Sequence, residues 1–485
     1  MPKRIPIPRL GKLEVISFAT GFSLMAFELV AARVLAPSIG SSTYVWTSVI
    51  GVIIAALSLG FFIGGRLADM RPKETDLVWL LCLTALTVVM TQLMYKDILA
   101  DMVQTFTDPR IQAVVGSLLL FAPTSFLVGM TSPYLAKLNV KSLKTTGQSV
   151  ASLDALNALG GITGTFVTGF FLFGYLGSRE TLSIVVLVLL ATSWLLVPRY
   201  RMAQRIVLSV ISIFIITTPP VLTPNIVDID TPSAHYQVVT FMKDFYEVNG
   251  LITGPSGVQS AVYKSGSLEP VFWYNQELAR LTLLQQPKRV LVLGGGAFTL
   301  PQYLAQQLPD STVDVVEIDP GLKHISEQYF QYKNPKNVEL IFDDARSFVQ
   351  TSKRTYDVVV VDVYGDTNIP FSLITKEYGQ AVAKRVKPDG IVVANVIAGL
   401  ANKPCKTVFG AVDAAYKTGF RYGLYSNQFG ADEARANHIL LYSRQRMTIP
   451  GMKPIPDLEG QLLTDNYAPA ERLYYACHQS TRPHN

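Results

Sequence analysis

Long apolar runs dominate the first half of the chain. Seven of them are long enough to cross a bilayer, which takes about 20 residues each. They lie near residues 14–36, 44–66, 76–96, 111–135, 151–177, 180–198 and 205–222. The first run has no small-residue cleavage site, so we expect it to remain as a span. The pattern predicts a multi-pass α-helical membrane domain over residues 1–224.

Beyond residue 225 the apolar residues occur in shorter runs. Three segments between 235 and 263, HYQVVTF, DFYEVNGLI and VQSAVY, have the β-branched and aromatic composition of strands. They predict a small antiparallel β lid over residues 225–285. The next five runs are continuous rather than alternating, and they lie at 289–293, 312–318, 338–342, 356–362 and 390–396.

Continuous apolar strands are typical of a parallel sheet that helices cover on both faces. Two later segments, RYGLYS and HILLYS, are expected to form an antiparallel edge. The pattern therefore predicts a doubly wound α/β domain over residues 286–445, followed by a C-terminal tail over 446–485.

The composition agrees with this division. Apolar residues make up 49% of the 485 residues and charged residues 16%, and the mean hydropathy is +0.29. The net charge of +6 is modest and lies largely in short loops between apolar runs. It indicates membrane orientation rather than nucleic-acid binding. We expect a lipid bilayer, that of the cell membrane, and a small molecule as partners, and no nucleic acid.

Positive charges fall unequally on the two sides of the predicted spans. One side carries four, Arg33, Lys96, Arg110 and Arg179. The other carries thirteen: Lys3, Arg4, Arg9, Lys12, Arg66, Arg71, Lys73, Lys137, Lys141, Lys144, Arg199, Arg201 and Arg205. The positive-inside rule predicts a cytoplasmic N-terminus. With seven spans, the α/β domain is then expected outside the cytoplasm.

Residues 64–73, GGRLADMRPK, resemble the cytoplasmic loop between the second and third helices of major facilitator transporters. The resemblance implies that the N-terminal region is similar to half of such a transporter. Few polar residues lie in the spans: Glu28 and Arg33 in the first run, Asp154 and Asn157 in the fifth. With the glycine-rich stretch GGITGTFVTGFFLFGYLG, they leave close helix packing and a transport path open, and packing is favoured.

The three cysteines are Cys82, Cys405 and Cys477. They have no metal-ligand spacing, and an odd number of scattered cysteines argues against a disulfide framework. We therefore expect neither a metal site nor a disulfide framework.

A glycine turn follows the first strand of the predicted α/β sheet. Ligands of doubly wound sheets bind at the carboxyl ends of the strands. Gly294, Gly295 and Gly296 lie there, and without side chains they let a ligand approach the backbone and the helix N-terminus. A purely structural tight turn is the alternative.

Acidic residues follow the next three strands. Glu317 comes 21 residues after Gly296, where an acid suits the two hydroxyls of a ribose. Asp344 follows the third strand, where a carboxylate can accept from an adenine amine. Asp362 ends the fourth strand, and Asp366 lies four residues later. Because GGGAFTLP lacks the GxGxxG spacing of dinucleotide binders, the set suggests an S-adenosyl nucleoside.

With these motifs the chain resembles the spermidine synthases, or polyamine aminopropyltransferases. It looks most like the membrane-fused group, in which a multi-span region precedes the catalytic domain. The resemblance rests on FELVAARVLAPSIGSSTYVW (27–46) and on the succession YQ, VQSAVY, YNQE, GGG, VEID, DDA and VVVDVY. It implies a Rossmann-like domain of the S-adenosylmethionine methyltransferase type. It also implies a small amine as acceptor, decarboxylated S-adenosylmethionine or S-adenosylmethionine as donor, no metal, and a homodimer as a further expectation.

The resemblance also implies a role for each donor-site residue. Gln237, in YQ, would contact the nucleoside end beside the glycine loop. Glu317, in VEID, would hold the ribose hydroxyls, and Asp344, in DDA, would hold the adenine.

On the acceptor side, the resemblance implies that Asp362 receives the proton of the attacking amine. Tyr274 would line the amine channel, Gln259 would line the same cleft, and Asp366 would be a second substrate acid. Such chemistry needs an acid, because an alkylamine has a pKa of about 10 and is protonated at neutral pH. A carboxylate stabilises that cation and takes its proton as the amine attacks the carbon next to the sulfonium.

Three positions depart from the family's pattern. Ala297 stands where the family has an aspartate, Gly365 holds the usual place of the second acid, and Tyr274 is followed by Asn275-Gln276. Donor recognition is expected to be kept and amine recognition altered. Three functions therefore stay open: an aminopropyltransferase making spermidine or a related polyamine, an S-adenosylmethionine-dependent methyl or alkyl transferase on another acceptor, and a non-catalytic polyamine sensor or transporter.

Overall fold

The computed structural model describes residues 11–140, 146–196, 202–218, 225–231, 233–255, 257–364, 369–428, 435–458 and 460–480. The chain forms two compact units. The first comprises Met1–Leu222 with Asp230–His235, and the second comprises Thr223–Ile229 with Tyr236–Asn485. Each unit has its own hydrophobic core.

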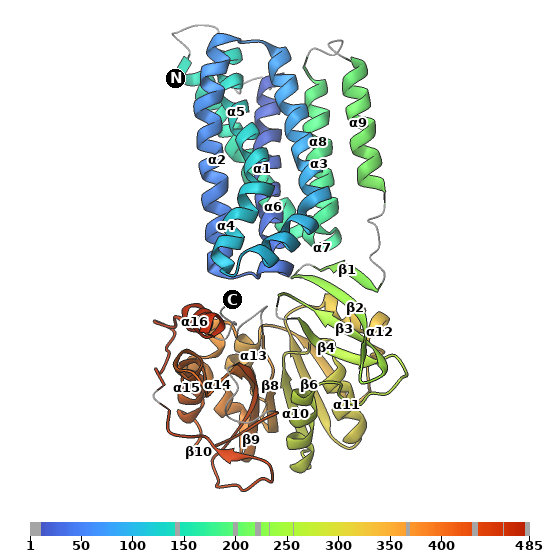
Figure 1. Ribbon diagram of the computed structural model, residues 1–485, viewed down its shortest axis with the longest axis vertical. Helices are drawn as coiled ribbons and strands as arrows, with labels where there is room; N and C mark the ends of the chain where they lie inside the picture. The colour runs from blue at the N-terminus through green and yellow to red at the C-terminus, as the bar shows by residue number, and fades with distance from the viewer. Residues whose placement is uncertain are drawn as a thin grey trace, which may run out of the picture. The chain divides into compact units, whose positions relative to one another are not determined.

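Helices form at every apolar run of the first unit, and they lie side by side in Figure 1. They are α1 (Lys12–Ile39), α2 (Thr43–Met70), α3 (Glu74–Thr105), α4 (Pro109–Leu120), α5 (Ala122–Asn139), α6 (Thr146–Val167), α7 (Phe173–Tyr175), α8 (Ser178–Trp194) and α9 (Met202–Thr217). A π-helical turn, Thr168–Leu172, joins α6 to α7. The predicted run at 111–135 is broken into α4 and α5, which meet at 51°. Pro123 lies in the first turn of α5, where its missing N–H ends the hydrogen-bond ladder of α4.

Fewer helices than predicted are long and apolar enough to span a bilayer. Within the described residues four qualify, α1, α2, α3 and α6 with its π turn, and the α4–α5 pair is a fifth if it forms one broken span. Helices α8 and α9 have 17 and 16 residues. That is about 25 Å of helix against a hydrocarbon core of about 30 Å. By length α8 and α9 are marginal for a span, and their predicted crossing of the bilayer stays a prediction.

Helices α1 and α6 approach each other at glycines. A Cβ added at Gly160 would lie 1.9 Å from the carbonyl oxygen of Phe18. A Cβ at Gly164 would also meet the backbone of α1. The amide of Asn157 donates to the carbonyl of Ser17 across the same interface, at 3.1 Å. These contacts confirm the close packing that the glycine-rich run predicts.

The second unit begins with a four-stranded antiparallel sheet, as the lid prediction requires. Its order is β1-β2-β3-β4. The strands are β1 (Ile226–Asp230), β2 (His235–Lys243), β3 (Tyr246–Ile252) and β4 (Val258–Tyr263). Strand β1 is an addition to the three predicted strands.

An eight-stranded sheet forms the rest of the second unit, in the order β12-β10-β11-β9-β8-β5-β6-β7. Strands β5 to β9 are parallel, and β11 and β10 form an antiparallel edge. The strands are β5 (Arg289–Leu293), β6 (Thr312–Glu317), β7 (Val338–Phe342), β8 (Tyr356–Val361), β9 (Val386–Ala398), β10 (Tyr422–Asn427), β11 (Ala436–Ser443) and β12 (Lys453–Pro454). This order confirms the predicted doubly wound, Rossmann-like sheet.

The strand order also locates a crevice. The chain runs outward from β5 through β6 to β7, and then returns to the other side of β5 as β8 and β9. The loops that follow β5 and β8 therefore diverge at their carboxyl ends, which is where such folds bind ligands. The helices of this unit are α10 (Trp273–Leu284), α11 (Thr299–Gln307), α12 (Gly321–Tyr329), α13 (Ala345–Thr351), α14 (Lys376–Arg385), α15 (Lys403–Lys417) and α16 (Ala470–Ser480).

The C-terminal tail folds back onto the sheet domain. Strand β12 pairs with β10, and α16 packs against α15. A disulfide joins Cys405 on α15 to Cys477 on α16. The prediction of no disulfide framework is thus wrong for this pair, because residues 72 positions apart meet only once the tail has folded back. Cys82 is free and buried.

We predict that Gly160→Ala destabilises the first unit. The added methyl would overlap the backbone of α1, and such overpacking costs about 1–3 kcal/mol. The measurement is the thermal unfolding midpoint of the purified full chain in detergent. Gly147→Ala on the same helix is the matched control, because nothing lies within 4 Å of a Cβ there. Equal midpoints for the two variants would contradict the close α1–α6 contact.

Candidate active site

The glycine loop, Gly294–Gly296, packs between the carboxyl ends of β6 and β8. Gly294 has a φ of +90°, and a Cβ on it would lie 2.2 Å from the carbonyl oxygen of Asp362. A Cβ on Gly295 would lie 2.3 Å from the ring of Phe298 and 3.3 Å from the Cβ of Glu317. Both positions therefore require glycine. This close contact brings the loop against two of the predicted site residues.

Glu317 is held by backbone donors of this loop and its own strand end. The N–H of Gly295 donates to Oε2 at 2.8 Å, and the N–H of Asp319 donates to Oε1 at 3.0 Å. Burial raises the pKa of Glu317, and the two N–H groups oppose that rise. The carboxylate is fixed in orientation, and each oxygen keeps a second lone pair that can accept from a ribose hydroxyl.

One apolar residue at this edge escaped the sequence analysis. Ile318 directly follows Glu317, and its side chain is 63% exposed. An exposed branched side chain at the carboxyl end of a central strand suits the face of a flat ring. The signal in the sequence was an isoleucine between two acids, in VEID.

Asp344 caps a helix in this structure. Its Oδ1 accepts the backbone N–H of Ser347, at 2.8 Å, at the start of α13. The side chain is exposed at the carboxyl end of β7, next to β6. Its role toward adenine stays a prediction.

Gln237 is bound within the lid. Its amide donates to Oδ1 of Asp228 on β1, at 2.9 Å. Its neighbour Tyr236 points to the opposite face of β2 and donates its hydroxyl to Asp319 at 2.8 Å. Tyr236, rather than Gln237, therefore joins the lid to the end of β6, and the contact of Gln237 with the nucleoside stays a prediction.

The structure brings three predicted residues together on the acceptor side. The hydroxyl of Tyr274, on α10, donates to the carbonyl of Gln259, on β4. Burial, together with the charge of Asp362, raises the pKa of Tyr274 well above its usual value. Desolvation likewise raises the pKa of Asp362, and the amide of Asn395 donates to its Oδ1 at 2.9 Å. The cluster is a carboxylate beside a neutral phenol.

Of the three departures named above, Gly365 lies outside the described residues, whereas Ala297 and Asn275-Gln276 lie within them. Asp366 lies outside the described residues, and its role stays a prediction. Ala297 is buried at 1% exposure, and its N–H donates to Oγ of Ser260 at 3.3 Å. Residue 297, where the resemblance leads us to expect an acid, is therefore a buried alanine in this chain. In the described part of the chain, no three His, Cys, Asp or Glu side chains form a candidate metal site.

The loop, Glu317 and Asp362 form one constellation. Glu317 ends β6 and Asp362 follows β8, the two strands on either side of β5, and the glycine loop lies between the two acids. Residues 271–402, which contain all three, match the family model "Spermine/spermidine synthase domain". This part of the chain is similar to a spermine/spermidine synthase domain, and it is called the synthase domain from here on. Gln237 and Gln259 lie before the matched part of this synthase domain.

Two curated relatives show how far the similarity extends. The chain is 29% identical over 143 residues to a polyamine aminopropyltransferase of Vibrio vulnificus (strain CMCP6), covering 28% of this chain and 48% of that protein. It is 32% identical over 129 residues to putrescine N-methyltransferase 2 of Nicotiana tabacum, covering 25% and 36%. The chain thus spans less than half the length of these relatives. The crystal structure of a probable spermidine synthase from Corynebacterium glutamicum ATCC 13032 is 19% identical, covers 44% of this chain and 78% of that chain, and has a TM-score of 0.38.

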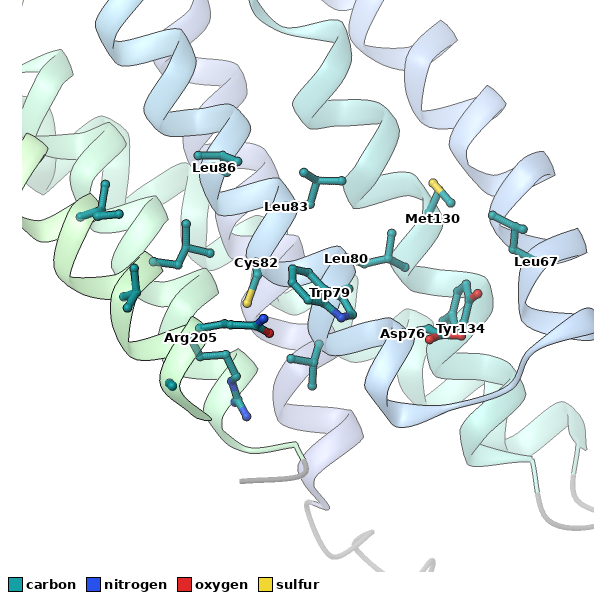
Figure 2. A pocket seen from close by; sticks show the side chains of 16 residues that line it. Leu67, Asp76, Trp79, Leu80, Cys82, Leu83, Leu86, Met130, Tyr134 and Arg205 are labelled. Carbon is teal, nitrogen blue, oxygen red and sulfur yellow. The ribbon is translucent and has the colours of Figure 1, made fainter. Parts of the chain in front are cut away.

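A separate cavity lies in the first unit, and all of its lining residues belong to that unit. Its volume is about 620 Å³, and side chains of α2, α3, α5 and α9 line it. Figure 2 shows the apolar side chains of Trp79, Leu83 and Met130 among them. The guanidinium of Arg205 donates to the backbone carbonyls of Ser193 and Leu196, at the end of α8. These bonds tie its charge to α8, and the cavity offers mainly an apolar wall.

We predict that Glu317→Gln weakens donor binding by about tenfold or more, because hydrogen bonds to a charged group contribute about 1.5–3 kcal/mol. The measurement is the Kd for S-adenosylmethionine and for its decarboxylated form, by titration calorimetry on the full chain. Glu339→Gln is the matched control, since Glu339 is exposed on the neighbouring strand β7 and pairs with Arg354. An unchanged Kd for Glu317→Gln would remove Glu317 from the donor site.

Proposed function

We propose that the chain is a membrane-bound polyamine aminopropyltransferase. It transfers an aminopropyl group from decarboxylated S-adenosylmethionine to a small amine such as putrescine. The observation that carries the proposal is the position of Asp362, which adjoins both the glycine loop and Tyr274 inside the matched domain. A carboxylate there can hold the acceptor cation next to the bound donor.

The chemistry needs few groups. The amine nitrogen forms a bond to the propyl carbon, the carbon–sulfur bond breaks, and neutral methylthioadenosine leaves. The proton lost by the amine passes to Asp362, which acts as general base. Glu317 holds the ribose, and the loop fixes the nucleoside so that the propyl carbon and the amine are in line.

We predict that the full chain in lipid nanodiscs, given decarboxylated S-adenosylmethionine and putrescine, yields spermidine and methylthioadenosine, detected by mass spectrometry. Asp362→Asn should lose about 100-fold or more of the rate, since it removes the general base. Its donor Kd should stay unchanged, because Asp362 is assigned to the acceptor. Asp389→Asn, an exposed acid in the same domain, is the control. Full activity in Asp362→Asn would overturn the assignment.

A second candidate function is an S-adenosylmethionine-dependent methyl or alkyl transferase with another acceptor. It is favoured by Ala297, which is buried where an acid would meet the aminopropyl or amine group. The relative named putrescine N-methyltransferase 2 supports the same alternative. Calorimetry with both donors separates the two functions, because tighter binding of the carboxylated donor would reject the aminopropyltransferase.

We further propose that the synthase domain faces the non-cytoplasmic side of the membrane. Stable disulfides are rare in the cytoplasm, and Cys405 and Cys477 form one. The charge pattern supports a cytoplasmic N-terminus. If the α4–α5 pair is one span, there are five candidate spans, and the number of crossings is odd whether α8 and α9 both cross or neither does. The domain that follows would then emerge on the side opposite the N-terminus.

We predict that the Cys405–Cys477 disulfide is present in living cells. After acid quenching and denaturation, a maleimide polymer should add to one thiol, that of Cys82, and to all three only after reduction. Cys405→Ser is the control, because the polymer should then add to two thiols, those of Cys82 and Cys477, before reduction. Three reactive thiols in the unreduced wild type would place the domain on the cytoplasmic side, and protease accessibility of a C-terminal tag in sealed vesicles would confirm the side independently.

A further inference from the structure

We propose that Asn395 is the positioning residue of the acceptor site: it holds the Asp362 carboxylate in place and is itself held by Asn437. The proposal rests on the proposed function for its catalytic meaning. Its structural content, a coupling between Asn395 and Asp362, can be measured without turnover.

The sheet register places the three side chains in a row. Strands β8 and β9 are parallel, with Val361 paired to Ala394, so Asp362 and Asn395 are neighbours one residue beyond. Strands β9 and β11 are antiparallel, with Asn395 paired to Ile439, so Asn437 is its diagonal neighbour on the same face. Only at this register do the three polar side chains meet.

The hydrogen bonds have one consistent direction. An ionised carboxylate only accepts, so Asn395 must turn its amide nitrogen to Oδ1 of Asp362, 2.9 Å away. Its amide oxygen then faces β11, where Nδ2 of Asn437 donates to it at 3.0 Å. Asn437 therefore fixes which end of the Asn395 amide points at the carboxylate. Asn395 is 4% exposed, so water has little access to replace either bond.

The backbone of Asn395 is tied to the same segment. The hydroxyl of Tyr364, two residues after Asp362, donates to the Asn395 carbonyl at 3.4 Å and accepts the N–H of Ile397. The end of β8 is thus joined to β9 through both the side chain and the main chain of Asn395. Asp362 is held at a defined place relative to the glycine loop.

Among the described residues, Asn395 is the only side chain that donates to Asp362. Within the ranges that the structure describes, the titratable groups near the carboxylate are Tyr274 from α10 and Tyr364 from its own segment. Desolvation raises the pKa of both phenols well above the usual value, so both are neutral in the working range. The ionisation of Asp362 therefore depends on desolvation, which raises its pKa, and on Asn395, which lowers it.

Replacing Asn395 by alanine should raise the pKa of Asp362 further. Without the amide donor, the ionised form of the carboxylate is less stable relative to the protonated form. A base with a higher pKa is protonated over more of the pH range. The acid limb of the kcat/KM profile for the amine should then move to higher pH, by about one unit or more.

The test uses Asn395→Ala and Asn437→Ala in the full chain. We expect the acid limb to move up in Asn395→Ala, to move less in Asn437→Ala, and the rates of both to approach the wild type at high pH. The donor Kd should stay unchanged. Asn249→Ala is the matched control, because this asparagine also bonds across elements, at 2.9 Å to Tyr329, but outside the network. An equal loss of rate at every pH, with the limb unmoved, would overturn the proposal.

A second measurement is independent of turnover. The thermal destabilisation caused by Asn395→Ala should grow as pH rises through the pKa of Asp362, because only the ionised carboxylate needs the donor. In the Asp362→Asn background that pH dependence should vanish. If the wild type shows no alkyl transfer, the proposed function fails. The comparison of Asn395→Ala in the wild-type and Asp362→Asn backgrounds still decides whether Asn395 holds Asp362. A pH-independent destabilisation in both backgrounds would refute the coupling.

Discussion

The candidate site depends on the close contact between the glycine loop and the ends of β6 and β8. Gly294 packs against the backbone of Asp362, and Gly295 packs beside Glu317. Any side chain at these two positions would push the loop away from the strands. The separation between the donor acid and the acceptor acid is therefore set by backbone packing, which is stiffer than a contact between flexible side chains.

This close packing places the carboxylates of Glu317 and Asp362 at a buried edge of the sheet. Each carboxylate needs hydrogen-bond donors to remain ionised there. Glu317 obtains them from two backbone N–H groups, which come with the fold of the loop and the strand end. Asp362 obtains its donor from a side chain on the adjacent strand, Asn395. The proposed donor site is thus supported by main-chain donors and the proposed acceptor site by a side chain, so the acceptor site can change with fewer structural consequences.

Each unit joins segments that are distant in the sequence, but by different interactions. In the first unit, Gly160 lets the backbones of α1 and α6 touch, and Asn157 bonds across the contact. The polar residues of that interface support packing, which favours an anchoring role over a transport path. In the second unit, the tail is closed by the Cys405–Cys477 disulfide. A membrane tether and a disulfide in the second unit agree with the proposal of an enzyme at a membrane surface outside the reducing cytoplasm.

Local pattern alone determined much of this protein. Continuous apolar runs predicted strands β5 to β9, and their parallel order placed Glu317 and Asp362 at one edge, since the carboxyl ends of parallel strands share that edge. Tertiary structure alone decided the rest. It paired cysteines 72 residues apart, broke the apolar run at 111–135 into α4 and α5, and placed Asn395 against Asp362. An asparagine in an apolar strand has no periodicity or motif to mark it, because its partner is chosen by the register between strands, and that register forms only when distant segments pack together.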